Sequence, residues 1–150
     1  MPKKVMLAPP ENIMVQAENL VKIYKSKDVE VMALQGLDLT VERGELMGLV
    51  GSSGSGKSTL LKILGGLLPP TTGKVLLDGQ DIYAMNAEQL AQVRRQKIGF
   101  IFQDFRLIDK MTVYENVAFA MRVVGASNKE IRRRVPQVLE LVGLADREKR

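Results

Sequence analysis

Nine consecutive residues combine the residue types that bind polyphosphate groups. The first eight of them fit the pattern G-x-x-x-x-G-K-[ST] without a gap. In chain order the nine residues are Gly51, Ser52, Ser53, Gly54, Ser55, Gly56, Lys57, Ser58 and Thr59. Glycines let successive backbone N–H groups turn into one concavity at a helix N-terminus, where the helix dipole favours an anion. Lys57 adds a positive charge and Ser58 a hydroxyl for Mg²⁺, so the stretch predicts a site for a nucleoside triphosphate with its metal ion.

The residues on either side supply the elements that must position this loop. The apolar run from Leu46 to Val50 predicts a short buried strand. Leucine and isoleucine recur at helical spacing from Leu60 to Leu68, and the Pro-Pro-Thr-Thr-Gly stretch at 69–73 ends that helix in a turn. A strand, a glycine loop and a helix form the context that the pattern requires. The alternative, a glycine-rich turn that binds nothing, suits a shorter motif better than this complete one.

Sheet elements are predicted before and after the loop. Residues 74–79 predict a strand and a turn, and the apolar stretch 98–103 is typical of a strand inside a parallel sheet. Alternating apolar residues predict an antiparallel β layer ahead of the loop. The alternating stretches are 13–17, 20–24, 29–34 and 37–41. The fold class is therefore α/β, with an antiparallel β layer and a partial parallel core sheet.

Three helices are predicted to begin at reciprocal capping pairs. The pairs are Asn86 with Gln89, Thr112 with Glu115, and Ser127 with Glu130. Pro136 lies inside the last of these helices and is expected to kink or split it, because proline removes a backbone donor and crowds the preceding turn. Gly143 is expected to end the same helix.

Composition and charge argue against several classes of protein. The 150 residues contain no cysteine, which excludes a disulfide framework and a thiolate metal site. No apolar run reaches the ~18 residues of a membrane span, and no apolar core of a signal peptide follows the basic start. The net charge of +5 is assigned to a solvated surface and a nucleotide site. Basic residues are scattered and lack interleaved aromatic residues, so nucleic acid is not an expected partner.

These motifs, in this order, resemble the first part of the ATP-binding subunit of an ABC transporter. The resemblance covers about residues 13–147 and extends beyond the phosphate loop. It includes the β layer, the turn at 69–73, the Val-Leu-Leu-Asp-Gly-Gln-Asp-Ile stretch at 75–82 and Phe-Gln-Asp at 102–104. Within that family the chain is similar to the group of lipoprotein-releasing, macrolide-exporting and cell-division ATPases.

The resemblance implies a P-loop NTPase fold of the ABC ATPase type, present in part. Residues 1–12 are then an N-terminal extension, and residues 13–150 are a truncated nucleotide-binding domain. The helical subdomain of that domain is expected to begin at about residue 105.

Functional roles carry over to matching positions. Tyr24 matches the aromatic residue that stacks on adenine, although a half-buried strand tyrosine is the alternative. Gln103 matches the glutamine that reaches Mg²⁺ and the attacking water, although it could simply be a polar residue that ends a strand. Lys57 and Gln103 are thus the candidate catalytic residues, and Ser58 and Gln103 the candidate metal contacts. ATP and Mg²⁺ are the implied cofactors.

Partners and location also follow from the resemblance. The segment from Asp104 to Gly125 matches the region where the family contacts a transmembrane permease subunit. The complete protein would pair with a second nucleotide-binding subunit. The implied location is the cytoplasm, peripheral to the inner face of the cell membrane.

Several catalytic parts of the family are missing from this sequence. The Asp-Glu pair that ends an apolar strand and the Leu-Ser-Gly-Gly-Gln signature are absent, and the switch histidine is impossible because the chain has no histidine. The nearest imitation of the strand ends in Asp78 and Gly79, which is interpreted as a turn. Because phosphoryl transfer depends on positioned groups, the chain alone is predicted not to hydrolyse ATP. Unpaired apolar strand edges also predict that it is poorly stable by itself.

Two other functions stay open. The first is a different P-loop enzyme: a GTPase would need Asn-Lys-x-Asp where residues 128–131 read Asn-Lys-Glu-Ile, and a kinase lid would need arginines that converge. Arg132, Arg133 and Arg134 instead point around a helix. The second is a non-catalytic module that binds nucleotide or a partner without turnover, which the missing carboxylates favour.

Overall fold

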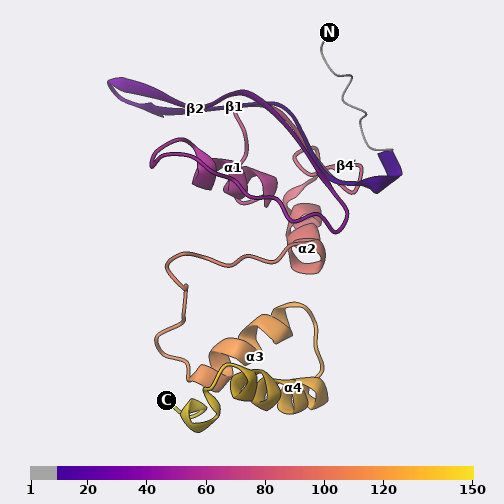
Figure 1. The fold of residues 1–150 in the computed structure, drawn as a ribbon, viewed down its shortest axis with the longest axis vertical. Helices are drawn as coiled ribbons and strands as arrows, with labels where there is room; N and C mark the ends of the chain where they lie inside the picture. The colour runs from indigo at the N-terminus through magenta and orange to yellow at the C-terminus, as the bar shows by residue number, and fades with distance from the viewer. Residues whose placement is uncertain (1–9) are drawn as a thin grey trace. The chain divides into compact units, whose positions relative to one another are not determined.

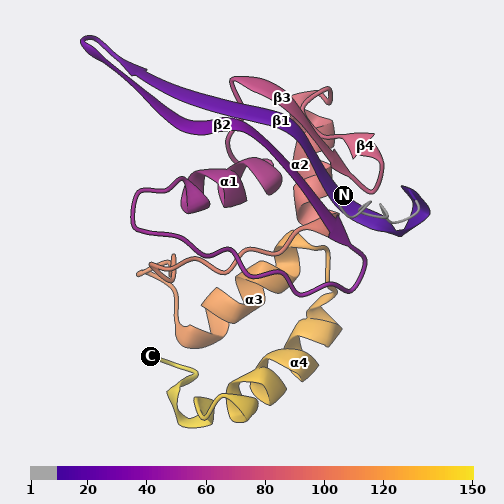
Figure 2. The ribbon, with the colours of Figure 1, turned by 45° about the horizontal axis from the view of Figure 1, so that its top comes forward.

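The structure, a computed structural model, describes residues 10–150 and divides into two compact units. The first unit ends at Arg94 and the second runs from Arg95 to Arg150. Figures 1 and 2 label the helices and strands, which are numbered in chain order. Most of the predicted N-terminal extension, residues 1–9, lies outside the described residues, and Pro10–Asn12 form a short 3-10 helix, η1.

The first unit is built on a four-stranded antiparallel sheet with the order β2-β1-β3-β4. β1 (Ile13–Ser26) and β2 (Val29–Glu42) form a long hairpin that contains all four predicted alternating stretches (Figure 1). β3 (Thr72–Leu77) pairs with the first half of β1, and the short β4 (Gln80–Asp81) pairs with β3. The predicted antiparallel layer and the predicted strand and turn at 74–79 are confirmed.

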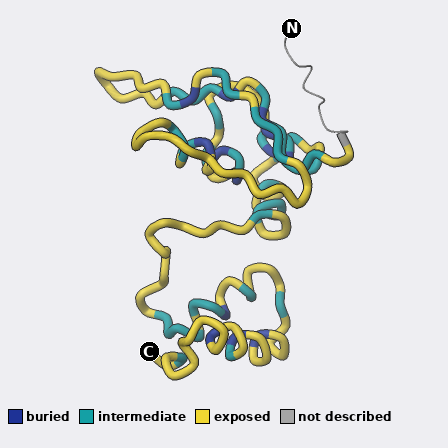
Figure 3. Tube along the Cα trace, viewed as in Figure 1, coloured by how far each residue is buried: buried dark blue, intermediate teal, exposed yellow. Residues whose placement is uncertain are grey.

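Helix α1 (Lys57–Leu64) follows the phosphate loop and lies beside the hairpin in both ribbon views (Figures 1 and 2). It buries Leu60 and Ile63, which are three positions apart and so share one face of the helix. Figure 3 shows the buried positions of the first unit gathered along the sheet and α1. The other buried apolar side chains of this unit are Ala17, Leu20, Leu34, Val75, Leu77 and Ile82.

Two predicted strands of a parallel core sheet are wrong for this chain. Residues 46–50 and 98–103 form no strand, and no strand within residues 10–150 pairs with either of them. A strand needs a neighbour for its backbone N–H and C=O groups, and an apolar run does not reveal whether that neighbour is present. Leu46, Val50 and Ile101 are consequently 99%, 96% and 103% exposed. The only sheet in the described part of the chain is the antiparallel one.

Helix α1 is shorter than its leucine pattern predicts. Gly66 has a φ of 67°, its N–H donates to the carbonyl of Ile63 at 3.0 Å, and the N–H of Leu67 donates to that of Lys62 at 2.8 Å. This pair of bonds is the Schellman arrangement, in which a left-handed glycine ends a helix. Leu67 and Leu68 therefore lie beyond the helix.

Helix α2 (Ala87–Lys97) begins at the predicted capping pair. The backbone N–H of Asn86 donates to Gln89 Oε1 at 3.0 Å, and the N–H of Gln89 donates to Asn86 Oδ1 at 2.9 Å. These two bonds satisfy backbone donors that a helix N-terminus leaves without intrahelical partners.

The second unit is built on helices α3 (Val113–Val123) and α4 (Asn128–Leu141). Both predicted capping boxes, at Thr112 and at Ser127, are present. The two helices pack through one buried apolar cluster. Its members are Ala118, Ile131, Val135 and Leu139.

Pro136 does not split helix α4, which is assigned as one helix from end to end. The flanking residues Val135 and Leu139 are buried against α3, and this packing outweighs the single hydrogen bond that the proline removes. Gly143, with a φ of 71°, ends the helix as predicted, and the N–H of Leu144 donates to the carbonyl of Leu139 at 2.7 Å.

Candidate nucleotide-binding site

The phosphate loop turns sharply and opens directly into helix α1. Gly54 and Gly56 have φ angles of 79° and 90°, a region that only glycine enters without strain. Gly56 is the N-cap residue and α1 begins at Lys57. Because glycine has no side chain, no side-chain cap engages the N–H groups of the first turn. The loop therefore presents helix N–H groups at the place where the sequence predicts an anion.

The hairpin supports the loop from behind. A Cβ atom on Gly56 would lie 2.5 Å from the carbonyl oxygen of Ala33 and 3.3 Å from Leu34 Cδ2, both on β2. The sequence explains this glycine by close backbone approach to a phosphate. The structure adds a second reason, which is contact with the backbone of the hairpin.

Lys57 turns its ammonium group back into the loop. Its Nζ donates to the carbonyl of Gly51 at 2.8 Å, to that of Ser52 at 2.5 Å and to Ser55 Oγ at 3.1 Å. A Cβ atom on Gly51 would lie 2.7 Å from Ser55 Oγ, so a side chain there would displace the Ser55 hydroxyl group. The loop is thus a narrow cradle around one positive charge.

The structure brings Tyr24 to the first turn of α1. Its hydroxyl oxygen lies 3.2 Å from Thr59 Oγ1, and the side chain is 43% exposed. The Nζ of Lys22, two residues earlier on β1, lies 5.5 Å from the centroid of the tyrosine ring. Ser58, between Lys57 and Thr59, is exposed. These predicted site residues therefore come from two elements, the hairpin and the start of α1.

Gln103 belongs to the second unit. It lies in a turn, is exposed and follows Phe102, whose ring stacks on that of Phe100 with centroids 5.5 Å apart. The predicted strand that was to end at this glutamine is not formed. The role of Gln103 stays a prediction.

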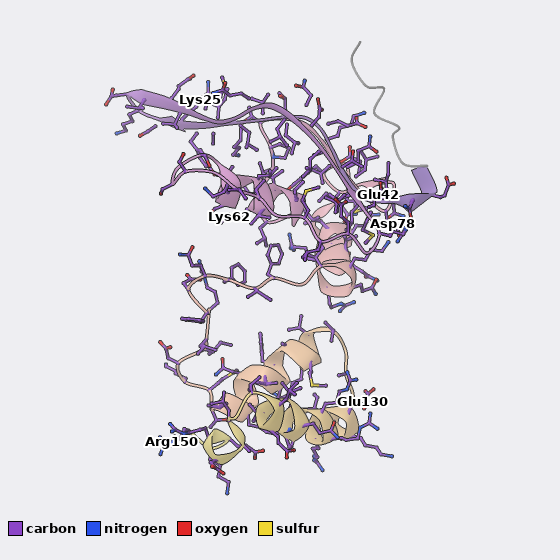
Figure 4. The ribbon with its side chains drawn as sticks, viewed as in Figure 1. Lys25, Glu42, Lys62, Asp78, Glu130 and Arg150 are labelled. Atoms are coloured by element: carbon purple, nitrogen blue, oxygen red, sulfur yellow. The ribbon has the colours of Figure 1, made fainter. Side chains whose placement is uncertain are left out.

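Asp78, the nearest imitation of a catalytic carboxylate, has a structural role. It has a φ of 53° at the turn between β3 and β4, and its carboxylate pairs with Arg43 at the end of the hairpin. Figure 4 labels Asp78 and the neighbouring Glu42 at this end of the sheet. The interpretation of Asp78 as a turn residue is confirmed.

Two residues that sequence reasoning missed hold the other end of α1. The Tyr83 hydroxyl lies 2.7 Å from the carbonyl oxygen of Ile63 and 2.6 Å from that of Leu68, and Arg94 Nη1 donates to the carbonyl of Gly66 at 2.8 Å. Burial raises the pKa of Tyr83 to about 12, against the opposing effects of the Leu68 hydrogen bond and the Arg94 charge. No local pattern links these two side chains to α1, because they approach it through the tertiary fold.

Comparison with known proteins identifies relatives over most of the chain. The family model described as ABC transporter matches residues 34–150. A methionine import ATP-binding protein of Desulfitobacterium hafniense is 46% identical over 134 residues, which are 89% of this chain and 39% of that protein. An uncharacterized ABC transporter ATP-binding protein of Thermotoga maritima is 50% identical over 126 residues, which are 84% of this chain and 54% of that protein.

The chain thus spans 39% and 54% of the lengths of these two relatives. Methionine import lies outside the three subgroups that the sequence favoured, so the subgroup stays a prediction.

Solved structures give the same family. A dimeric cassette, MJ0796, in a post-hydrolysis state bound to ADP and Pi, is 37% identical with a TM-score of 0.82, and the match covers 91% of this chain and 60% of that one. A second dimeric structure of MJ0796, described as a bacterial ABC transporter cassette, has a TM-score of 0.83 at 36% identity and the same coverage. The chain therefore belongs to the ABC transporter family and has part of the P-loop NTPase fold of its ATP-binding cassettes.

Proposed function

We propose that the chain binds ATP with Mg²⁺ as the nucleotide-binding part of an ABC-type transport ATPase. The observation that carries this proposal is the Lys57 ammonium group inside the glycine loop, 2.8 Å from the carbonyl of Gly51, at the N-terminal end of α1. A charged phosphate oxygen attracts that ammonium group more strongly than a neutral carbonyl does. The N–H groups of the first helical turn complete an anion site, so the residues present fit a polyphosphate.

Each predicted site residue has a proposed part in this binding. The loop from Gly51 to Gly56 surrounds the phosphate groups, and Ser58 offers its exposed hydroxyl to Mg²⁺. Gln103 is proposed to reach Mg²⁺ and to orient the attacking water in the complete protein. The exposed ring of Tyr24 is proposed to stack on adenine, a contact worth about 1–3 kcal/mol per base in other proteins.

Partners and location are proposed from the family. Phe105 and Leu107, in the segment from Asp104 to Gly125, are 82% and 68% exposed, which suits contact with a permease subunit. The helical subdomain is proposed to begin at about residue 105. The complete protein is proposed to pair with a second nucleotide-binding subunit. It is proposed to lie at the cytoplasmic face of the membrane. Within residues 10–150, no helix is long and apolar enough to cross a bilayer.

Binding without turnover is the proposed activity of this chain by itself. The sequence has no Asp-Glu pair after an apolar strand, and Asp78 pairs with Arg43. Phosphoryl transfer needs several positioned charged groups, so we expect hydrolysis only when the missing parts of the cassette are supplied.

Isothermal titration calorimetry with ATP tests the proposal. We expect heat from Mg-ATP binding to the wild-type chain, a weaker signal without Mg²⁺, and a loss of at least tenfold in affinity for Lys57→Ala, because a charged hydrogen bond is worth about 1.5–3 kcal/mol. Lys62→Ala is the matched control, since Lys62 is an exposed lysine later in the same helix. Equal loss in both variants, or no binding by a folded wild-type chain, would contradict the proposal.

A parallel titration with GTP addresses the other P-loop enzymes. A tyrosine ring that stacks on a base discriminates only weakly between different bases. We therefore expect the affinity for GTP to lie within about tenfold of the affinity for ATP. A preference for GTP of more than a hundredfold would favour a GTPase instead.

A further inference from the structure

Tyr24 reaches the phosphate loop through its hydroxyl group while its ring stays partly open to solvent. The hydroxyl oxygen lies 3.2 Å from Thr59 Oγ1, and the side chain is 43% exposed. Thr59 lies in the first turn of α1, is half-buried and directly follows Ser58. One hydrogen bond therefore joins the hairpin, where a base is proposed to stack, to the helix end where phosphate is proposed to bind.

The direction of this hydrogen bond depends on what else Thr59 contacts. Either oxygen can donate in the structure. A phosphate oxygen only accepts hydrogen bonds. A Thr59 hydroxyl directed to phosphate must therefore donate its O–H hydrogen bond to the phosphate. Thr59 Oγ1 then accepts from Tyr24, and the two bonds form a chain from Tyr24 through Thr59 to the phosphate. Each bond in such a chain polarises and strengthens the next.

Lys22 holds the tyrosine ring in place for this bond. Its Nζ donates to the carbonyl of Pro69 at 2.7 Å and lies 5.5 Å from the centroid of the Tyr24 ring. Lys22 and Tyr24 are two residues apart on β1, so they project from the same side of the strand. A cation over the ring and a hydrogen bond at its hydroxyl together restrict the tyrosine before any ligand arrives.

We infer that Tyr24 is a positioning residue for the phosphate half of the site, and that it acts through its hydroxyl on Thr59. This role is separate from stacking, because it needs the oxygen atom and no base. The inference rests on the proposed function, since it assumes that polyphosphate binds at the start of α1.

Inorganic tripolyphosphate with Mg²⁺ separates the hydroxyl from the ring, because this probe has no base. Its affinity and that of Mg-ATP are measured by calorimetry for the wild-type chain, Tyr24→Phe, Thr59→Val and the double variant. We expect Tyr24→Phe to weaken both ligands by the same factor, roughly three- to tenfold for one hydrogen bond. We expect the double variant to be no weaker than Thr59→Val alone, because the two hydroxyls act through one path.

Three controls make the test specific. Tyr114→Phe removes a tyrosine hydroxyl from α3, in the second unit, and should leave both affinities unchanged. Tyr24→Leu removes ring and hydroxyl together, so it should weaken Mg-ATP more than tripolyphosphate. Circular dichroism and thermal melting establish that each variant is folded like the wild-type chain.

The outcomes distinguish this inference from the proposed function. Wild-type affinity of Tyr24→Phe for tripolyphosphate, or additive losses in the double variant, would overturn the inference while leaving nucleotide binding intact. A folded wild-type chain that binds neither ligand would overturn the proposed function, and the inference with it.

Discussion

Gly56 in the loop is constrained by the hairpin as well as by the ligand that the loop is proposed to bind. Gly56 combines a φ of 90° with a position where a Cβ atom would meet the carbonyl oxygen of Ala33 at 2.5 Å. Gly54 has a similar φ of 79°, but a Cβ atom there would meet nothing within 4 Å. The pattern G-x-x-x-x-G-K-[ST] specifies Gly56 and leaves position 54 open, and it does not give the reason for either glycine.

Substitution of the two glycines by alanine should separate strain from collision. Gly54→Ala is expected to cost about 1 kcal/mol of unfolding free energy, because alanine is strained at positive φ. Gly56→Ala is expected to cost about 2–4 kcal/mol, because the hairpin must also move. Denaturant unfolding of both variants measures the difference, and equal costs would contradict the contact between loop and hairpin.

Tyr83 provides a test at alkaline pH. Its pKa is raised from 10.0 to about 12, chiefly by burial, so the folded chain keeps the phenol proton over a range in which the unfolded chain loses it. The contribution of the protonated Tyr83 hydroxyl to the free energy of unfolding is complete below pH 10 and is lost as pH rises toward 12. We expect the stability of the wild-type chain to fall more steeply over this range than that of Tyr83→Phe. Parallel pH profiles of the two chains would contradict the burial of this hydroxyl against α1.

At the scale of elements, short sequence patterns correctly predicted those features that hydrogen bonds between nearby residues determine. The capping boxes at Thr112 and Ser127, the hairpin strands and the helix end at Gly143 all follow from residues a few positions apart. The strands at 46–50 and 98–103 were predicted wrongly, because a strand also depends on neighbours from elsewhere in a chain. The helical spacing of the leucines likewise predicted too long a helix α1. Gly66, with its positive φ, was the residue that could have indicated where the helix ends.

The capping boxes should make the helices of the second unit sensitive to acid. Hydrogen bonds from the backbone and hydroxyl of Thr112 lower the pKa of Glu115 from 4.5, and Ser127 does the same for Glu130. A depressed pKa contributes stability above pH 4.5 that is lost as pH falls through the folded value. We expect helical circular dichroism to decrease on acidification below this pH.

Substitution by glutamine isolates the capping carboxylate. Glu115→Gln keeps an oxygen acceptor and removes the titrating carboxylate. Part of the decrease in helical circular dichroism at low pH should therefore disappear in this variant. Glu140→Gln, at an exposed position near the end of α4, is the control and should retain it. Identical acid profiles for Glu115→Gln and the wild-type chain would show that the cap does not govern this transition.

At the scale of the whole molecule, the chain has two compact units and apolar segments that no strand in residues 10–150 covers. The match covers 60% of the solved cassette MJ0796, and the fold class was predictable because the phosphate loop and the β layer lie close together in sequence. The exposed state of residues 46–50 was not predictable, since it depends on partner strands and not on the residues themselves.

These exposed segments should cause self-association. Large exposed apolar patches are aggregation sites in soluble proteins. The paired substitution Leu46→Ser and Ile101→Ser removes side chains that are 99% and 103% exposed, and it is expected to lower the associated fraction seen in sedimentation velocity. Leu61→Ser, a single exposed leucine on α1, is the control. A wild-type chain that sediments as a monomer at micromolar concentration would contradict this expectation.

Hydrogen–deuterium exchange with and without Mg-ATP tests the central claim most directly, because it locates the ligand on the chain. The account predicts slower amide exchange across residues 51–59 and at the start of α1, with no change in α3 and α4. The same protection should be absent in Lys57→Ala. Mg-ATP binding with unchanged exchange at residues 51–59 would contradict it.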